Sequence, residues 1–80
     1  MPLSALRAVF VEALGLPPDT DVDALTYRSV PQWDSVAHMA LIARLESRFD
    51  LMLETDEVLD LSSFARCREI LAAHGCRFDD

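Results

Sequence analysis

Apolar residues recur every three to four positions in four stretches of the chain, which is the spacing of helices that bury one face. In the first stretch, Leu3, Leu6 and Phe10 share a face. A proline precedes this stretch and Gly15 follows it, and these residue types are common at the respective ends of helices. We therefore expect a first helix from about residue 3 to 14.

Three further helices are predicted by the same spacing together with a capping residue in front of each. Their expected ranges are 35–49 after Asp34 or Ser35, 56–60 after Thr55, and 63–74 after Ser62 or Ser63. Alternating apolar and polar runs bounded by turns, which would indicate strands, are weak. The sequence therefore predicts an all-α fold with three longer helices, one short third helix and a long first loop.

The connection between the first two helices is long and contains apolar residues. It spans about residues 15–34 and shows no sustained period. Loops of this length without structure are uncommon in compact domains. We expect a short turn near residues 21–25 and packing across the other helices. The apolar residues available for this packing are Val22, Leu25, Tyr27, Val30 and Trp33.

The helix expected at 35–49 carries more apolar surface than one core stripe needs. At about 100° per residue, its apolar residues fall into two stripes on nearly opposite sides. The stripe that faces the core consists of Leu41, Ile42, Leu45 and Phe49. The second stripe consists of Val36, Met39, Ala40 and Ala43. Either the long loop covers this second stripe, or the stripe is an exposed patch on which other proteins dock.

Charge and length narrow the classes of function. The 80 residues suit one domain, and fourteen acidic against seven basic residues give a net charge of −7. Such a domain repels phosphate backbones, so we expect no nucleic-acid partner. No apolar run approaches the roughly 20 residues of a membrane span. Two cysteines and the lack of a signal-like start indicate a reducing, cytoplasmic environment.

One cluster contains the residue types of a catalytic triad. Asp34, Ser35 and His38 lie within five positions at the start of the second expected helix. A nucleophilic serine would need a sharp glycine-flanked turn and an oxyanion hole, and neither is evident here. From its spacing alone, Ser35 is well explained as a helix N-cap. We therefore expect no catalysis by the chain itself.

No metal site is predicted. The acidic run at 19–23 resembles the opening of a calcium-binding loop, but Ala24 and Val30 stand where such a loop needs Gly and Glu. His74 and Cys76 are too few for a zinc site. We interpret the acidic run as a solvated loop.

The two cysteines are expected in different environments. Cys67 shares a helical stripe with Phe64 and Leu71, so we expect it to be buried. Cys76 follows Gly75, near the end of the chain, so we expect it to be exposed.

Around Ser35 the chain resembles the acyl carrier proteins. The stretch Trp33-Asp34-Ser35-Val36 is similar to the Asp-Ser-Leu motif of that family, with Val36 in place of the usual Leu. The apolar-rich helix that follows, its ending at Phe49 and the next few residues are also similar. The resemblance covers about residues 3–74, and the serine stands at a helix start after a twenty-residue loop in an acidic chain.

The resemblance implies a four-helix bundle of the acyl-carrier type and a carrier function. Ser35, next to Asp34, would receive 4′-phosphopantetheine from coenzyme A, attached by a phosphopantetheinyl transferase. The thiol of this arm would hold acyl groups as thioesters. The carrier would be a monomer, and its other partners would be an acyl- or aminoacyl-loading ligase and downstream acyl-processing enzymes. The residues implied to line an acyl pocket are Leu45, Leu53, Val58, Leu61 and Cys67. For these five, plain core packing is the other interpretation.

In charge the chain departs from the family pattern. Family members usually carry several acids along the second helix, whereas residues 35–49 hold Glu46 against Arg44 and Arg48. Five acids and no base lie instead between residues 50 and 60. We therefore expect partners to contact a surface made of Val36, Met39, Ala43, Glu46, Glu57 and Asp60.

The charge pattern favours a specialised lipid, polyketide or secondary-metabolite pathway over general fatty-acid synthesis. An aminoacyl or peptidyl carrier loaded by a dedicated ligase is an alternative. In a third interpretation, from a different class, the chain is a small non-catalytic helical adaptor in which Ser35 is only a cap.

Overall fold

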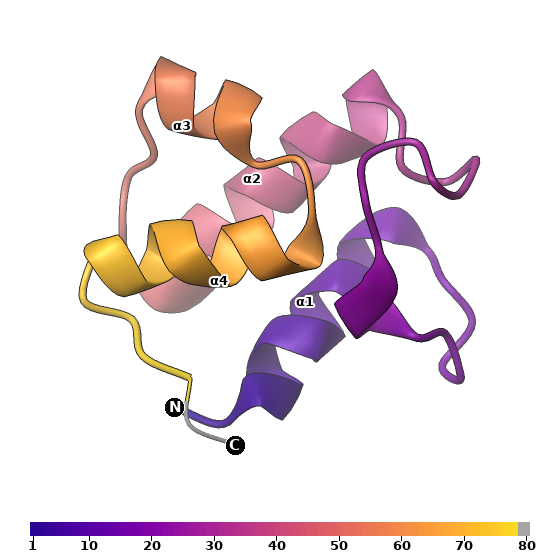
Figure 1. The fold of residues 1–80 in the computed structure, drawn as a ribbon, viewed down its shortest axis with the longest axis horizontal. Coiled ribbons are helices and arrows are strands. Elements are labelled where there is room, and N and C mark those ends of the chain that lie inside the picture. The colour runs from indigo at the N-terminus through magenta and orange to yellow at the C-terminus, as the bar shows by residue number, and fades with distance from the viewer. Residues whose placement is uncertain (79–80) are drawn as a thin grey trace.

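The computed structural model describes residues 1–78, and its regular structure there is entirely helical (Figure 1). The α-helices are α1 (Leu3–Leu14), α2 (Ser35–Phe49), α3 (Thr55–Asp60) and α4 (Phe64–Ala73), and one 3-10 turn, η1 (Val22–Ala24), interrupts the long connection. None of the helices in this described part is long and apolar enough to cross a membrane.

Side-chain caps fix where α2 and α4 begin. The carboxylate of Asp34 accepts a hydrogen bond from the backbone N–H of Ala37 at 2.9 Å, and the hydroxyl of Ser63 accepts one from Arg66 at 2.9 Å. These bonds satisfy N–H groups that have no partner within the helix. Of the alternatives left open by the sequence, Asp34 and Ser63 are therefore the N-caps.

The start of α3 differs from the expectation. Thr55 is its first helical residue, and Glu54 occupies the N-cap position. The carboxylate of Glu57 accepts a hydrogen bond from the backbone N–H of Glu54 at 2.9 Å, as in a capping box. The predicted N-cap at Thr55 is wrong, because the side chain of Glu57 bonds to the backbone of Glu54 and so starts the helix one residue earlier.

Left-handed residues end α1 and α2. Gly15 has a φ of 64° after α1, and the N–H of Leu16 then bonds to the carbonyl of Val11 at 3.0 Å. After α2, Asp50 adopts a φ of 53° in the same position. Both arrangements follow the usual C-terminal capping pattern, in which glycine is the common residue and an Asp is less so.

The core is built around an edge-to-face aromatic cluster. The ring of Phe10 in α1 lies 5.6 Å from that of Trp33 in the connection and 5.1 Å from that of Phe64 in α4. All three side chains are almost completely buried. Such aromatic pairs contribute about 0.5–1.5 kcal/mol beyond the area they bury. The cluster joins α1, the connection and α4 into one core.

The long connection packs against the helices, as predicted. Val22, Leu25 and Trp33 are buried. The N–H of Tyr27 bonds to the carbonyl of Ser62 at 2.7 Å, and the N–H of Phe64 bonds to the carbonyl of Leu25 at 3.0 Å. The connection is thereby held against the segment between α3 and α4, beside the start of α2 (Figure 1).

The prediction for one cysteine is confirmed and that for the other is wrong. Cys67 is fully buried, and burial raises the pKa of its thiol to about 12. Cys76 is only 8% exposed. Gly75, with a φ of 89°, turns the chain back so that the N–H of Cys76 bonds to the carbonyl of Leu71 at 2.9 Å. This capping motif folds the residue after the glycine onto the helix that it ends.

Candidate functional site

The hydroxyl of Ser35 is not used to start α2. Ser35 is the first residue of the helix and is exposed, while the carboxylate of the preceding residue, Asp34, provides the cap. Within the described part of the chain, no hydrogen bond involves the Ser35 hydroxyl. The role of a simple N-cap, which the sequence alone allowed for Ser35, is therefore taken by its neighbour.

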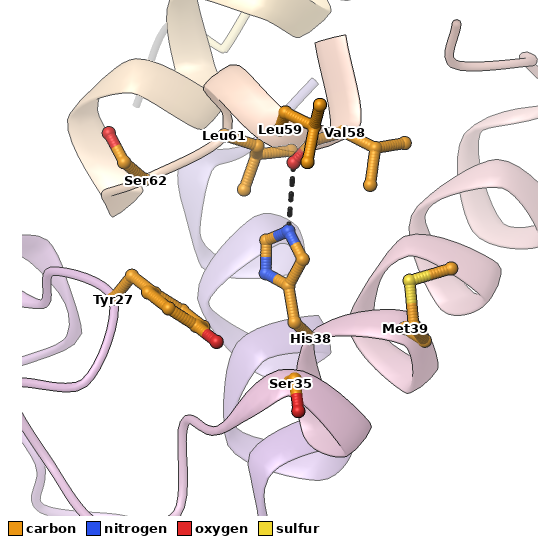
Figure 2. Close-up of a pocket in the computed structure, with 8 residues that line it drawn as sticks. All are labelled: Tyr27, Ser35, His38, Met39, Val58, Leu59, Leu61 and Ser62. Atoms are coloured by element: carbon orange, nitrogen blue, oxygen red, sulfur yellow. Dashed lines mark hydrogen bonds between the residues drawn. The ribbon is translucent and has the colours of Figure 1, made fainter. Parts of the chain in front are cut away.

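A cavity of about 300 Å³ opens next to Ser35 (Figure 2). Its lining comes from the long connection, α2, α3 and the segment after α3, and consists of Tyr27, Ser35, His38, Met39, Val58, Leu59, Leu61 and Ser62. Most of these side chains are apolar or aromatic. The volume is at the lower end of the range for ligand pockets, about 300–1,000 Å³.

Both ring nitrogens of His38 are engaged at the wall of this cavity. Its Nδ1 accepts a hydrogen bond from the indole N–H of Trp33 at 3.0 Å, and its Nε2 lies 2.9 Å from the carbonyl oxygen of Val58 (Figure 2). An indole N–H can only donate and a carbonyl can only accept, so the ring that satisfies both is neutral and carries its proton on Nε2. His38 therefore has no free nitrogen with which to act as a base toward Ser35.

α3 is attached to the rest of the molecule mainly through polar contacts. None of its six residues is buried. The hydrogen bond from His38 to the Val58 carbonyl ties it to α2 across the cavity. Because elements with few buried apolar contacts open at low free-energy cost, α3 is the element whose movement would enlarge the cavity most easily.

Two acids of the expected partner surface form bonds within the molecule. The carboxylate of Glu57 lies 2.8 Å from Nε2 of His74, and that of Asp60 pairs with Arg66. The pKa of Glu57 is lowered, first by the backbone N–H of Glu54 and then by His74. The Arg66 guanidinium lowers the pKa of Asp60. Both carboxylates thus hold α3 to α4 while remaining near the surface.

The second apolar stripe of α2 is open to solvent. Val36 is 79% exposed and Met39 is 58% exposed, and Ala43 is exposed as well. Leu59 of α3, which the sequence did not single out, is 80% exposed. The alternative in which the long loop covers this stripe is therefore wrong, because the loop packs on the side of α1 and α4 instead.

Opposite charges flank this apolar stripe. Arg44 and Arg48 lie toward α1, where they line a groove of about 200 Å³ together with Glu12. In Figure 1, α3, whose acids are Asp56, Glu57 and Asp60, lies on the side of α2 away from α1. Glu46, the remaining charge of α2, is half-buried, and its carboxylate accepts a hydrogen bond from the N–H of Leu53 at 2.9 Å. That carboxylate stabilises the turn between α2 and α3.

The residues implied for an acyl pocket lie in three settings. Val58 and Leu61 line the cavity. Leu45 and Cys67 are fully buried in the main core, and Leu53 is half-buried against it. Besides Ser35, the lining also contains five residues that were not among the implied pocket residues: Tyr27, His38, Met39, Leu59 and Ser62. The aromatic residues of the long loop, Tyr27 and Trp33, were the signals in the sequence that the loop packs near this site.

No protein-family model, curated protein or solved structure matches this chain.

Proposed function

We propose that this chain is an acyl carrier protein that carries acyl groups as thioesters on a 4′-phosphopantetheine arm attached to Ser35. The observation that carries the proposal is the state of the Ser35 hydroxyl. It is exposed, it is free of hydrogen bonds to the described residues, and it stands at the start of a long helix beside an apolar cavity. Because Asp34 already caps the helix, modification of Ser35 would not remove a bond that the fold needs.

The attachment reaction would use a separate transferase. The Ser35 oxygen would attack the phosphorus of coenzyme A that bears the pantetheine, forming an ester bond to that phosphorus. The bond from the same phosphorus to the bridging oxygen would break, and adenosine 3′,5′-bisphosphate would leave. The proton of the hydroxyl would pass to a base of the transferase, because His38 has both ring nitrogens engaged. The product phosphodiester would lie at the start of α2, where the helix dipole favours an anion.

The cavity supports a role in sheltering the cargo. Ser35 is one of the residues that line it, so a thiol-bound group could fold back from the arm into it. The small volume favours a short acyl or aminoacyl group over a long chain. The weak attachment of α3, which forms one wall, would let the cavity widen.

The exposed surface supports docking of enzymes that act on the arm. Val36, Met39 and Leu59 offer apolar contact close to Ser35. A partner whose face is basic opposite α3 and acidic opposite Arg44 and Arg48 would match the charges on both sides. This polarity favours a dedicated loading enzyme in a specialised pathway over enzymes with a uniformly basic docking patch.

The test is the mass of the intact protein after incubation with a broad-specificity phosphopantetheinyl transferase and coenzyme A. We expect the mass to rise by one phosphopantetheine. Ser35→Ala should fold and gain nothing. Ser62→Ala is the matched control, because Ser62 is also exposed and lines the same cavity, and it should be modified like the natural protein. Modification of the Ser35→Ala variant would overturn the proposal.

A further inference from the structure

Arg28 holds a backbone conformation that its side chain does not favour. Its φ is 67°, and among residues 1–78 the other non-glycine residue with a positive φ is Asp50, which ends α2. Arg28 ends no helix. It is the third residue of a turn in which the N–H of Ser29 bonds to the carbonyl of Thr26 at 2.9 Å. Glycine or asparagine is usual where a turn needs a positive φ, so an arginine here is costly to the backbone.

This turn places a cation beside Tyr27, which lines the same cavity as Ser35. The guanidinium carbon of Arg28 lies 5.4 Å from the centre of the Tyr27 ring, within the range of a cation–π contact. Tyr27 lines the same cavity as Ser35, and its hydroxyl points toward the side of the cavity on which Ser35 lies (Figure 2). Tyr27, and to a smaller degree the carboxylate of Asp34, raise the pKa of the Arg28 guanidinium. The guanidinium of Arg28 is thus attracted by the carboxylate of Asp34, the residue before Ser35.

Arg28 differs from the arginines that stabilise the fold. Arg7 pairs with Asp23 and Arg66 pairs with Asp60, and each of these pairs joins two elements. Among the residues that the structure describes, Arg28 forms no salt bridge, and its side chain is exposed. Its charge therefore remains available to an anion that approaches the start of α2.

We propose that Arg28 binds the phosphate that joins Ser35 to its arm, an inference that rests on the proposed function. A phosphodiester on Ser35 would stand next to the carboxylate of Asp34, which caps the same helix start. Two adjacent negative charges repel each other, and the dipole of α2 offsets this only in part. The guanidinium of Arg28, whose donors match phosphate oxygens, supplies the missing positive charge. The unfavourable backbone of Arg28 is then compensated by recognition of the arm.

The variant Arg28→Gly separates charge from backbone, because glycine accepts the positive φ without strain. Arg28→Lys retains the charge but not the planar fork. Arg77→Gly, at an exposed arginine near the chain end, is the matched control. The unfolding midpoint of each protein is measured without and with the phosphopantetheine arm, at low and at high salt. The rate of modification by the transferase and coenzyme A is measured alongside.

Attachment of the arm should lower the unfolding equilibrium constant of the natural protein. At low salt, we expect this decrease to be about three- to fivefold larger in the natural protein than in Arg28→Gly. This difference should shrink at high salt. Arg77→Gly should gain as much stability from the arm as the natural protein does. If the arm stabilises Arg28→Gly as much as it stabilises the natural protein, this inference is wrong and the proposed function still stands. A slower modification of Arg28→Gly without that change in stability would also overturn it, because Arg28 would then contact the transferase. Failure of the natural protein to be modified would overturn both.

Discussion

Replacement of His38 by Ala should destabilise the protein strongly, although His38 is only half-buried. The imidazole connects three elements. Its Nδ1 accepts the indole N–H of Trp33 from the long connection, its backbone belongs to α2, and its Nε2 donates to the carbonyl of Val58 in α3. The indole of Trp33 is completely buried. The substitution removes the acceptor that the structure provides for this buried N–H.

The magnitude follows from the groups that lose contacts. A buried donor left without a partner costs about 1–3 kcal/mol. His38 also stacks on Trp33, with 6.1 Å between ring centres, and meets the edge of Tyr27 at 5.5 Å. Each such contact contributes about 0.5–1.5 kcal/mol. The sum is about 2–6 kcal/mol, against about 4–12 kcal/mol for the total stability of a chain of this size.

Thermal and urea unfolding measure the effect. For a domain of this length, 1 kcal/mol corresponds to about 4–8 °C in Tm, so His38→Ala should lower Tm by about 10 °C or more. His38→Asn should recover part of the loss, because its side-chain oxygen can take the place of Nδ1 as acceptor for Trp33. His74→Ala is the control, because it removes a surface contact to Glu57 that contributes at most about 1 kcal/mol. Equal losses for His38→Ala and His74→Ala would refute the reasoning.

Three further predictions concern charge, thiols and docking. Because the pKa values of Glu57 and Asp60 are lowered in the folded state, their bonds stabilise the fold at neutral pH, and this stability is lost as pH falls through the carboxyl range. Melting curves from about pH 6 to about pH 3 should show the loss, and the loss should be smaller in Arg66→Ala. Both cysteines should react slowly with a thiol reagent in the native state. Cys76 should be the faster, because it lies outside α4 and is 8% exposed, whereas Cys67 is fully buried within α4. Faster labelling of Cys67 would contradict the packing of α4. Met39→Asp should slow loading by the cognate ligase while the free energy of unfolding stays nearly constant, since Met39 is exposed, and unchanged loading would exclude this patch as the docking surface.

The helices were predictable where local signals decide their ends. α1 runs over the residues expected for it because an apolar stripe stops at Gly15, and α2 runs over its expected residues because Asp34 caps it. At the start of α3, two adjacent residues, Glu54 and Thr55, can each occupy the N-cap position. The hydrogen bond from the Glu54 N–H to the Glu57 carboxylate decides for Glu54. Local propensity alone cannot rank two such caps.

Tertiary packing explains what the sequence left undetermined around the site. The resemblance around Trp33-Asp34-Ser35-Val36 singled out Ser35, whereas its spacing alone indicated an N-cap. The cavity beside it depends on backbone bonds that hold Tyr27 to Ser62, between segments 35 positions apart in the sequence. No short-range pattern encodes that pairing. The turn at Arg28 was equally hidden, because arginine gives no signal for a positive φ.

Burial of Cys76 shows the same limit at the end of the chain. Gly75 indicates the end of a helix, but the residue type does not specify the direction that the chain takes after it. In a left-handed cap the following residue folds back onto the last turn, which here brings Cys76 against α4.

The measurement that tests the central claim most directly is fragment mass spectrometry of the protein after treatment with transferase and coenzyme A. If the account is correct, one phosphopantetheine is found, and it lies on the fragment that contains Ser35. The nearby exposed Ser29 and Ser62 provide the contrast, because both lie in loops rather than at the start of a long helix. Attachment at either of these serines, or a fully unmodified chain under conditions in which an authentic carrier is modified to completion, would contradict the claim.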